Sequence, residues 1–167
     1  MRWFNQIMRV RSCRQILTDC RGFTLGEMLV VTGIISILTA IAVPNFVSMQ
    51  PSLRLNGASR EVFGKLMWAR AQAVEQNITY SVAFTSNHTL QIIRDANANG
   101  SADTGESSES VDIQLDYPDC TFSVTSGDTT PNFHGRGTTD GQTQITISNT
   151  AGTRVITVTA TGNIKVT

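Results

Sequence analysis

Residues 95–106 carry oxygen-bearing side chains at the spacing of a calcium-binding loop. The stretch reads DANANGSADTGE, which matches the pattern Asp-x-Asn-x-Asn-Gly followed by five residues and Glu. Calcium takes six to eight hard oxygen ligands at flexible geometry. One hypothesis for this loop is therefore calcium binding. The pattern assigns the ligand positions to Asp95, Asn97, Asn99, the Ser101 carbonyl, Asp103 and Glu106.

The context of this loop keeps a second interpretation open. The loop lies between two runs that are typical of strands, TLQIIR and VDIQL, whereas the calcium loop of an EF-hand joins two helices. Asp, Asn and Gly are also the residues that any exposed turn prefers. The sequence is thus compatible with a calcium site and with a solvated hairpin loop.

A single carboxylate stands inside a strongly apolar stretch near the N-terminus. Residues 23–43 read FTLGEMLVVTGIISILTAIAV, and Glu27 is the only charged residue among them. As a helix this stretch spans about 30 Å, which is enough to cross the core of a bilayer. A lone carboxylate there costs about 2.5 to 3.5 kcal/mol on insertion scales, so such a group is normally paired and functional. The alternative is a plain signal anchor with an incidental Glu.

Charge is distributed unevenly along the chain. Of 13 Lys and Arg and 13 Asp and Glu, residues 1–22 hold five Arg and one Asp. Basic residues next to a membrane segment mark the end that stays in the cytoplasm. The remainder is acidic and is not an obvious polyanion binder, because affinity for nucleic acid comes from clustered cations. Arg136, Arg154 and Lys165 would make a weak patch if the fold brought them together.

Residue patterns typical of enzymes are missing from the sequence, so we do not expect catalysis. His88 and His134 are the only histidines, and each is isolated in the sequence from Cys or paired carboxylates at metal spacing. A phosphate-binding loop and a dinucleotide fingerprint are also missing. Cys120 is the only cysteine after residue 22, and we expect it to be a buried, small apolar residue in a strand. An intermolecular disulfide is the alternative.

The residues after the apolar stretch show the spacing of an amphipathic helix. Apolar residues recur three and four positions apart, which places them on one helix face. This face consists of Ala58, Val62, Leu66, Ala69 and Ala73. Phe63 and Trp68 are expected to pack beneath a sheet, because aromatic residues are enriched in cores.

Together the two stretches predict one long, bent helix from about Thr24 to Gln76. Pro44 and Pro51 each remove a backbone hydrogen bond, and Gly33 lowers helix propensity. Kinks or melted turns are therefore expected between residues 33 and 57.

From Ile78 onward the apolar period changes to two, which predicts antiparallel strands joined by hairpins. A turn at Gly162 and Asn163 precedes a final edge strand. A helix that buries one face against such a sheet gives an α+β fold. The expected strands are ITYSVAF, TLQIIR, VDIQL, TFSV, TQITIS and RVITVTA.

The segment RGFTLGEMLVVTGIISILTAIAVPNF, residues 21–46, resembles the N-terminal signature of type IV pilins and type II secretion pseudopilins. That signature has a basic leader ending in Gly, then Phe, then Glu at the fifth position of the mature chain. Counted from Phe23, Glu27 is the fifth residue and Pro44 the twenty-second, where this superfamily has its helix-kinking proline. The DANANG loop and the later FHGRG and TGNIKV segments resemble the GspH/FimT group of minor pilins and pseudopilins.

The resemblance implies a processing step and an assembly role. A prepilin peptidase would cut between Gly22 and Phe23 and methylate the new amino group of Phe23. Glu27 would then pair with the cationic N-terminus of a neighbouring subunit. The implied fold is the pilin fold, a long N-terminal helix packed on an antiparallel β-sheet.

The resemblance also implies a domain organisation and a location. Residues 1–22 would be the leader, 23–46 the apolar transmembrane and assembly helix, 47–77 its amphipathic half and 78–167 the antiparallel β domain. The precursor would cross the inner membrane once, with the globular domain in the periplasm. It would then enter a type IV pilus or a type II secretion pseudopilus.

Two functions follow from this resemblance. The first is a minor subunit at or near the tip of such a filament. The second is DNA uptake in natural transformation, because some relatives are DNA receptors through a C-terminal Gly-Arg-x-Arg motif. Here the corresponding residues are Gly162, Asn163, Ile164 and Lys165, which retain one cation, and this departure counts against DNA binding. Arg136 and Arg154 are the other candidate contacts to DNA.

Overall fold

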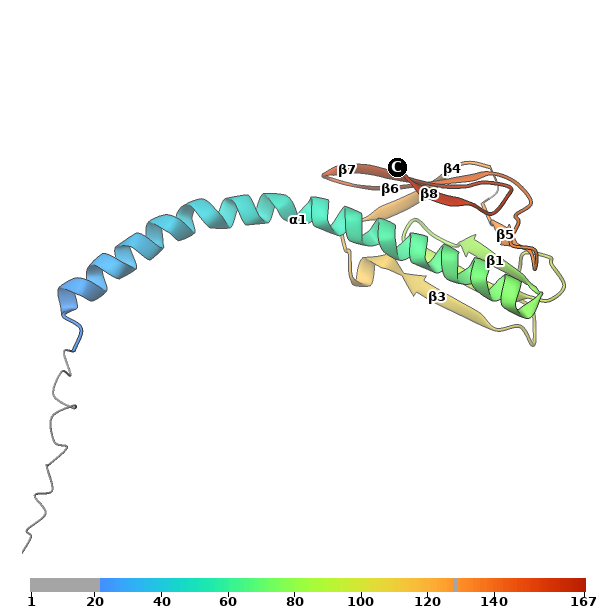
Figure 1. Ribbon diagram of the computed structural model, residues 1–167, viewed down its shortest axis with the longest axis horizontal. Helices are drawn as coiled ribbons and strands as arrows, with labels where there is room; N and C mark the ends of the chain where they lie inside the picture. The colour runs from blue at the N-terminus through green and yellow to red at the C-terminus, as the bar shows by residue number, and fades with distance from the viewer. Residues whose placement is uncertain (1–21, 128) are drawn as a thin grey trace, which may run out of the picture. The chain divides into compact units, whose positions relative to one another are not determined.

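A computed structural model describes residues 22–127 and 129–167 of the chain (Figure 1). The chain divides into two compact units, Met1–Pro44 and Asn45–Thr167. Of the predicted leader, all residues except Gly22 lie outside the described part.

Helix α1 runs from Leu25 to Gln76 and is 52 residues long. The prediction of one long helix over these residues is confirmed. Every residue in it is helical, so the melted turns expected between residues 33 and 57 are not found. A proline removes one backbone hydrogen bond, and the bonds on either side are enough to keep the helix continuous at Pro44 and Pro51.

The first part of α1, residues 25–46, exposes its apolar side chains on every side. A window of this helix has a mean hydropathy of 2.1, and α1 is long and apolar enough to cross a membrane. In a helix that is apolar all round, the side chains must be covered by lipid or by other protein. The exposed apolar residues of this part include Leu25, Leu29, Val30, Ile34, Ile35, Ile37, Leu38, Ile41 and Val43.

The second part of α1, residues 47–76, buries one face. All five residues of the predicted apolar face are fully buried, and Leu55 and Ser59 join them. The helix ends at Gln76, and the next residue, Asn77, adopts a left-handed conformation with φ 53°. The Ile78 N–H then donates to the Ala73 carbonyl at 3.3 Å, as in a Schellman cap.

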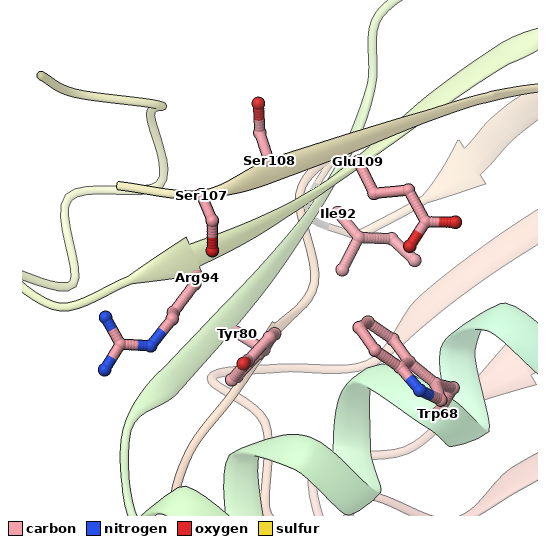
Figure 2. Close-up of a pocket in the computed structure, with 7 residues that line it drawn as sticks. All are labelled: Trp68, Tyr80, Ile92, Arg94, Ser107, Ser108 and Glu109. Carbon is pink, nitrogen blue, oxygen red and sulfur yellow. The ribbon is translucent and has the colours of Figure 1, made fainter. Parts of the chain in front are cut away.

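Trp68 was predicted to pack beneath the sheet, but it is only partly covered. Its ring meets that of Tyr80 edge to face, with centroids 6.1 Å apart, and the residue stays 43% exposed. The exposed side of Trp68 lines a cavity between α1 and the strands (Figure 2). Phe63, by contrast, packs against the core, as expected.

The strands form two antiparallel sheets beside the second part of α1 (Figure 1). The α+β fold class is confirmed, and the strands divide between two four-stranded sheets where the sequence predicted one. The first sheet has the order β3-β2-β1-β5, with β1 Thr79–Phe84, β2 Thr89–Asp95, β3 Ser108–Asp112 and β5 Asn132–Phe133. The second has the order β4-β6-β7-β8, with β4 Thr121–Ser126, β6 Thr143–Asn149, β7 Gly152–Val158 and β8 Ile164–Val166.

The third strand differs from the predicted VDIQL run. Strand β3 ends at Asp112, and Ile113–Leu115 forms a short 3-10 helix, η1. The cause is local: the Asp112 carboxylate accepts the Gln114 N–H at 2.9 Å and so caps this turn.

The core lies between the helix and both sheets. Its largest fully buried side chains come from all three elements and include Phe133, Leu66, Leu90, Ile145, Ile147 and Ile156. Cys120 is fully buried within this core, as predicted. It precedes β4 and is not itself part of a strand.

Candidate assembly site and other predicted sites

Glu27 closes the first turn of α1 as a member of a capping box. The N–H and the hydroxyl of Thr24 both donate to Glu27 Oε2, at 2.9 and 3.0 Å. In return the Glu27 N–H donates to the Thr24 hydroxyl at 3.2 Å. These reciprocal bonds satisfy donors that a helix N-terminus otherwise leaves open. Sequence reasoning missed this role, although Thr-x-x-Glu before an apolar run is its signature.

The capping box uses only one of the two carboxylate oxygens. Within the described part of the chain, Glu27 Oε1 accepts no hydrogen bond, and the residue is exposed. A carboxylate can accept several donors at once. Glu27 can therefore keep its cap and also take a cation from a neighbouring molecule.

The predicted cleavage bond lies just outside the helix. Gly22 and Phe23 are both exposed and precede α1, which begins at Leu25. The bond between them is thus in a non-helical, open stretch that a peptidase can approach. Pro44 lies within α1 and is exposed.

Asp95, the first residue of the predicted calcium loop, is fully buried and has a structural role. Its Oδ2 accepts the Ser81 hydroxyl at 2.8 Å and the Gly100 N–H at 2.6 Å, and its Oδ1 accepts the Asn99 N–H at 3.0 Å. These contacts tie the loop to β1. The Asp95 carboxylate is therefore satisfied by protein donors.

The other side chains of this loop are also hydrogen-bonded to groups within the loop. The side-chain amides of Asn97 and Asn99 both donate to Asp103 Oδ2, at 2.8 and 2.6 Å. Glu106 accepts the N–H groups of Ala96 and Asp103 at 2.9 and 3.1 Å. The Ser101 N–H donates to Asn99 Oδ1 at 2.8 Å.

The loop arranged in this way does not fit a calcium ion. The side-chain amides of Asn97 and Asn99 turn their N–H groups toward Asp103, whereas a calcium ion would need their oxygens. Among residues 22–127 and 129–167, no three His, Cys, Asp or Glu side chains are grouped so that they could hold a metal ion. Calcium binding stays a prediction, and it requires the Asn97 and Asn99 amides to turn. Calorimetry on the full chain tests it: neither heat nor a shift in melting temperature at millimolar calcium would dismiss the site.

The three cations considered for DNA lie in different places on the globular unit. Arg154 Nε donates to Asn56 Oδ1 at 3.2 Å, near the start of the buried helix face. Arg136 lines a polar cavity with Asn77 and Thr79, just past the end of α1. Along a helix, the separation of residues 56 and 77 amounts to about 30 Å.

Lys165 does not extend the surface that Arg154 belongs to. Lys165 pairs with Thr157 across β7 and β8, and successive residues of a strand point to opposite faces of the sheet. Arg154 shares its face with the buried Ile156, whereas Thr157 and Lys165 lie on the other face. The structure therefore does not gather the three cations into one patch.

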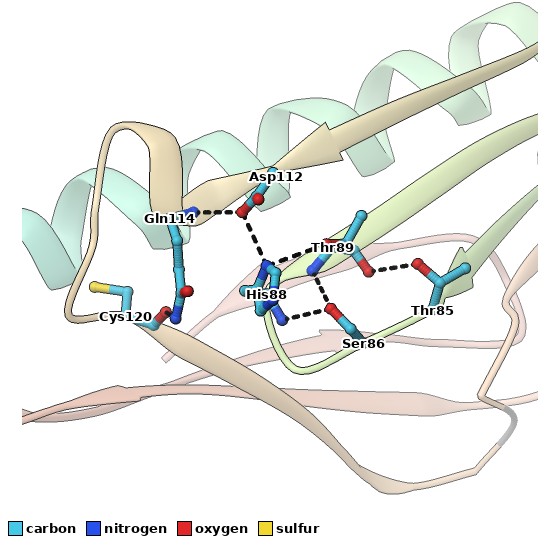
Figure 3. A network of polar contacts seen from close by, with 7 residues as sticks. All are labelled: Thr85, Ser86, His88, Thr89, Asp112, Gln114 and Cys120. Atoms are coloured by element: carbon cyan, nitrogen blue, oxygen red, sulfur yellow. Dashed lines mark hydrogen bonds and ion pairs between the residues drawn. The ribbon is translucent and has the colours of Figure 1, made fainter.

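Each histidine has one aspartate partner in the fold, although neither stands near a Cys or paired carboxylates at metal spacing in the sequence. His88 Nδ1 lies 3.0 Å from Asp112 Oδ1 and 3.1 Å from the Thr89 hydroxyl (Figure 3). The Gln114 N–H, together with His88, holds the pKa of Asp112 below its ordinary value. This contact ties the turn after β1 to the end of β3. His88 and Asp112 are 24 residues apart, which is why spacing did not reveal the pair.

The second pair joins His134 and Asp140. His134 Nε2 lies 2.6 Å from Asp140 Oδ1, and the Asn132 side-chain amide donates to Asp140 Oδ2 at 2.9 Å. His134 and Asn132 hold the pKa of Asp140 below its ordinary value. Both side chains are partly exposed. The contact braces the loop after β5.

Two family models match the chain. The first, described as type II transport protein GspH, covers residues 58–162. The second, described as the prokaryotic N-terminal methylation motif, covers residues 17–43. The two matches fall on the globular unit and on the apolar segment with its preceding residues. No curated protein matches the chain.

Solved structures of two filament subunits share the fold. The type IV minor pilin FimU of Pseudomonas aeruginosa (strain PAO1), in two crystal forms, is 23% and 24% identical, with TM-scores of 0.55 and 0.52. These matches cover 68% of this chain and 87% and 92% of the FimU chains. The minor pseudopilin EpsH from the type 2 secretion system of Vibrio cholerae is 9% identical, with a TM-score of 0.50, over 68% of this chain and 96% of EpsH.

Proposed function

The chain belongs to the GspH family of minor pilins and pseudopilins, and on this premise we propose that its mature form is built into a filament through residues 23–46. The observation that carries the proposal is the exposure of the apolar side chains of this part of α1. The filament is a type IV pilus or a type II secretion pseudopilus. Members of this family are structural subunits, and we propose no catalytic activity.

The apolar part of α1 needs a cover before and after assembly. In the precursor this cover is the inner membrane, which the helix crosses once with the basic leader in the cytoplasm and the globular unit in the periplasm. In the filament the cover is formed by the same helices of other subunits. The methylation motif at residues 17–43 implies processing by a prepilin peptidase before this transfer.

Glu27 sets the register of the helix in this proposal. Cleavage after Gly22 creates an amino group on Phe23, four residues before Glu27. Oxygen Oε1 of Glu27 has no bond within the described residues, so it is open to the amino group of a neighbouring subunit. Such a pair neutralises a charge that is costly in an apolar environment.

A place at or near the tip is the finer part of the proposal. The two similar solved proteins are named a minor pilin and a minor pseudopilin. A minor subunit does not make up the bulk of the shaft, and a place at the end of the filament is compatible with that. The globular unit would then face partners at that end.

Two variants of Glu27 separate the pairing role from the capping role. Gln serves in a capping box as well as Glu does, so Glu27→Gln keeps the cap and loses the charge, whereas Glu27→Ala loses both. We expect both variants to insert into the membrane and to be reduced at least tenfold in sheared filament fractions, measured by quantitative immunoblotting. Normal incorporation of Glu27→Gln would show that the charge pair is not needed.

A further inference from the structure

The four outer edges of the two sheets are not equally protected. Strands β5 and β8 are two and three residues long, and β4 has a register irregularity between Val124 and Ser126. Short length and bulges are ways in which proteins block unwanted strand pairing. Strand β3 has five residues, no proline and an unbroken register from Ser108 to Asp112. It is therefore the regular open edge among the described strands.

The hydrogen bonds on either side of β3 show which of its backbone groups face outward. The Arg94 N–H donates to the Ser107 carbonyl at 2.9 Å, and the Ile113 N–H donates to the His88 carbonyl at 3.0 Å. In an antiparallel pair these bonds recur at every second residue. Ser107, Glu109, Val111 and Ile113 thus bond toward β2. The N–H and C=O groups of Ser108, Ser110 and Asp112 point to the open side.

A cavity of about 210 Å³ lies beside this edge, between the strands and α1 (Figure 2). Trp68 faces it from the helix, and Glu109 and Ile92 face it from the strands. Glu109 is paired with Ile92, whose side chain is buried, so both lie on the helix-facing side of the sheet. The cavity also includes Tyr80, Arg94, Ser107 and Ser108.

The surroundings of the edge are acidic. Residues 96–116 hold five Asp and Glu and no Lys or Arg. Two cations reach the area from other segments: Lys65 Nζ pairs with Glu109 Oε1 at 2.6 Å, and Arg94 Nε donates to Gln76 at 3.1 Å. A basic partner matches this charge distribution, and complementary charge favours the correct encounter.

We propose that the β3 edge binds an extended segment of another protein that carries a Lys or Arg opposite Glu109. The segment adds as a further strand through the outward groups of Ser108, Ser110 and Asp112. Its side chain opposite Glu109 enters the cavity. There the aliphatic stem of a Lys or Arg lies on Trp68, and its charge lies near the Glu109 carboxylate.

Peptides provide the first test. The full chain in zwitterionic detergent micelles is titrated against a fluorescently labelled octapeptide of alternating Lys and Val, and binding is read as fluorescence polarisation. A peptide with Glu in place of every Lys and a Lys–Val peptide with a central Pro serve as controls. We expect both controls to bind at least tenfold more weakly. Equal binding of the Lys and Glu peptides would overturn the proposal.

Variants of the chain provide the second test. A proline is tolerated on an edge strand where its N–H would face solvent, so Ser110→Pro removes one outward donor, and Ser110→Thr is the matched control. We expect Ser110→Pro to weaken binding at least tenfold at an unchanged melting temperature, while Ser110→Thr binds normally. Trp68→Ala and Glu109→Gln should each weaken binding several-fold without involving the backbone.

Two results would contradict the proposal. One is full binding of the Lys–Val peptide by both Trp68→Ala and Glu109→Gln. The other is a dimer of the wild-type chain that Ser110→Pro abolishes, because this would assign the edge to a second copy of the same chain.

Discussion

The two parts of helix α1 differ in where their apolar side chains find cover. In the first part, residues such as Ile34 and Leu38 are 53% and 61% exposed. In the second part, Val62 and Leu66 are fully buried against the sheets. The difference lies in the pattern: apolar residues stand at nearly every position of the first part, whereas in the second part the buried apolar residues recur every third or fourth position.

This comparison teaches which part of the helix depends on the rest of the chain. A one-sided apolar face can be covered by sheets of the same molecule, so the second part is a component of the globular core. A helix that is apolar on all sides cannot be covered in that way and needs lipid or other helices. Folding and assembly are thus assigned to successive stretches of one helix.

The largest expected effect comes from removing the same side chain in each part. Leu66→Ala leaves a cavity in the core and should lower the free energy of unfolding of the globular unit by about 2–5 kcal/mol. Leu38→Ala should leave that free energy unchanged, because Leu38 is 61% exposed and is not among the residues of the core. Denaturant titration of both variants in micelles measures the difference. Equal losses would mean that the two parts do not differ as described.

A smaller effect is expected at two glycines. Gly162 has φ 76°, and a Cβ there would lie 1.8 Å from the Gly137 carbonyl oxygen. Gly162→Ala should therefore cost about 1–3 kcal/mol. Gly33 has open space around it, so Gly33→Ala should leave the unfolding of the globular unit unchanged. Thermal unfolding compares them, and a neutral Gly162→Ala would contradict the close approach of these two loops.

The smallest effect concerns acid. Glu27 is the only ionisable side chain of residues 22–44, so pH acts mainly on the globular unit. The lowered pKa of Asp140 contributes stability above its ordinary pKa, and this contribution is lost as the pH falls through the lowered value. The contribution is small because Asp140 is about half exposed.

The His134→Ala variant tests this contribution. It should raise the pKa of Asp140 toward the ordinary value, as followed by NMR titration of the carboxyl group. The melting temperature should fall slightly at neutral pH and match the wild type in strong acid. His88→Ala is the comparison, because the Gln114 N–H is the main cause of the lowered pKa of Asp112 and stays in place. An unchanged pKa of Asp140 in His134→Ala would refute the assignment.

Local patterns predicted much of the fold. The apolar period of three and four placed Val62, Leu66 and their neighbours on the buried face, and alternation marked most of the strands. Two features that local patterns could not predict depend on contacts distant in sequence. Pairing between strands decides that there are two sheets, and the His88 and Asp112 pair forms only when β3 lies beside β2.

The candidate sites show the same limit. The functional importance of Glu27 was predicted from the apolar stretch around it. Its capping role also has a sequence signature, Thr-x-x-Glu, which the prediction did not use. The residues of the calcium motif are joined by hydrogen bonds within one loop, because a turn rich in Asn and Asp bonds to itself. The motif did not predict which way the amides of Asn97 and Asn99 point. The open edge at β3 became visible only once the strand order was known.

Two events are expected for this chain: cleavage after Gly22 and assembly through the helix that follows. Intact-mass and N-terminal peptide analysis of the protein recovered from purified filaments tests them most directly. We expect a chain that begins at Phe23 with a methylated amino group. A filament-bound chain that still contains residues before Phe23 would contradict it.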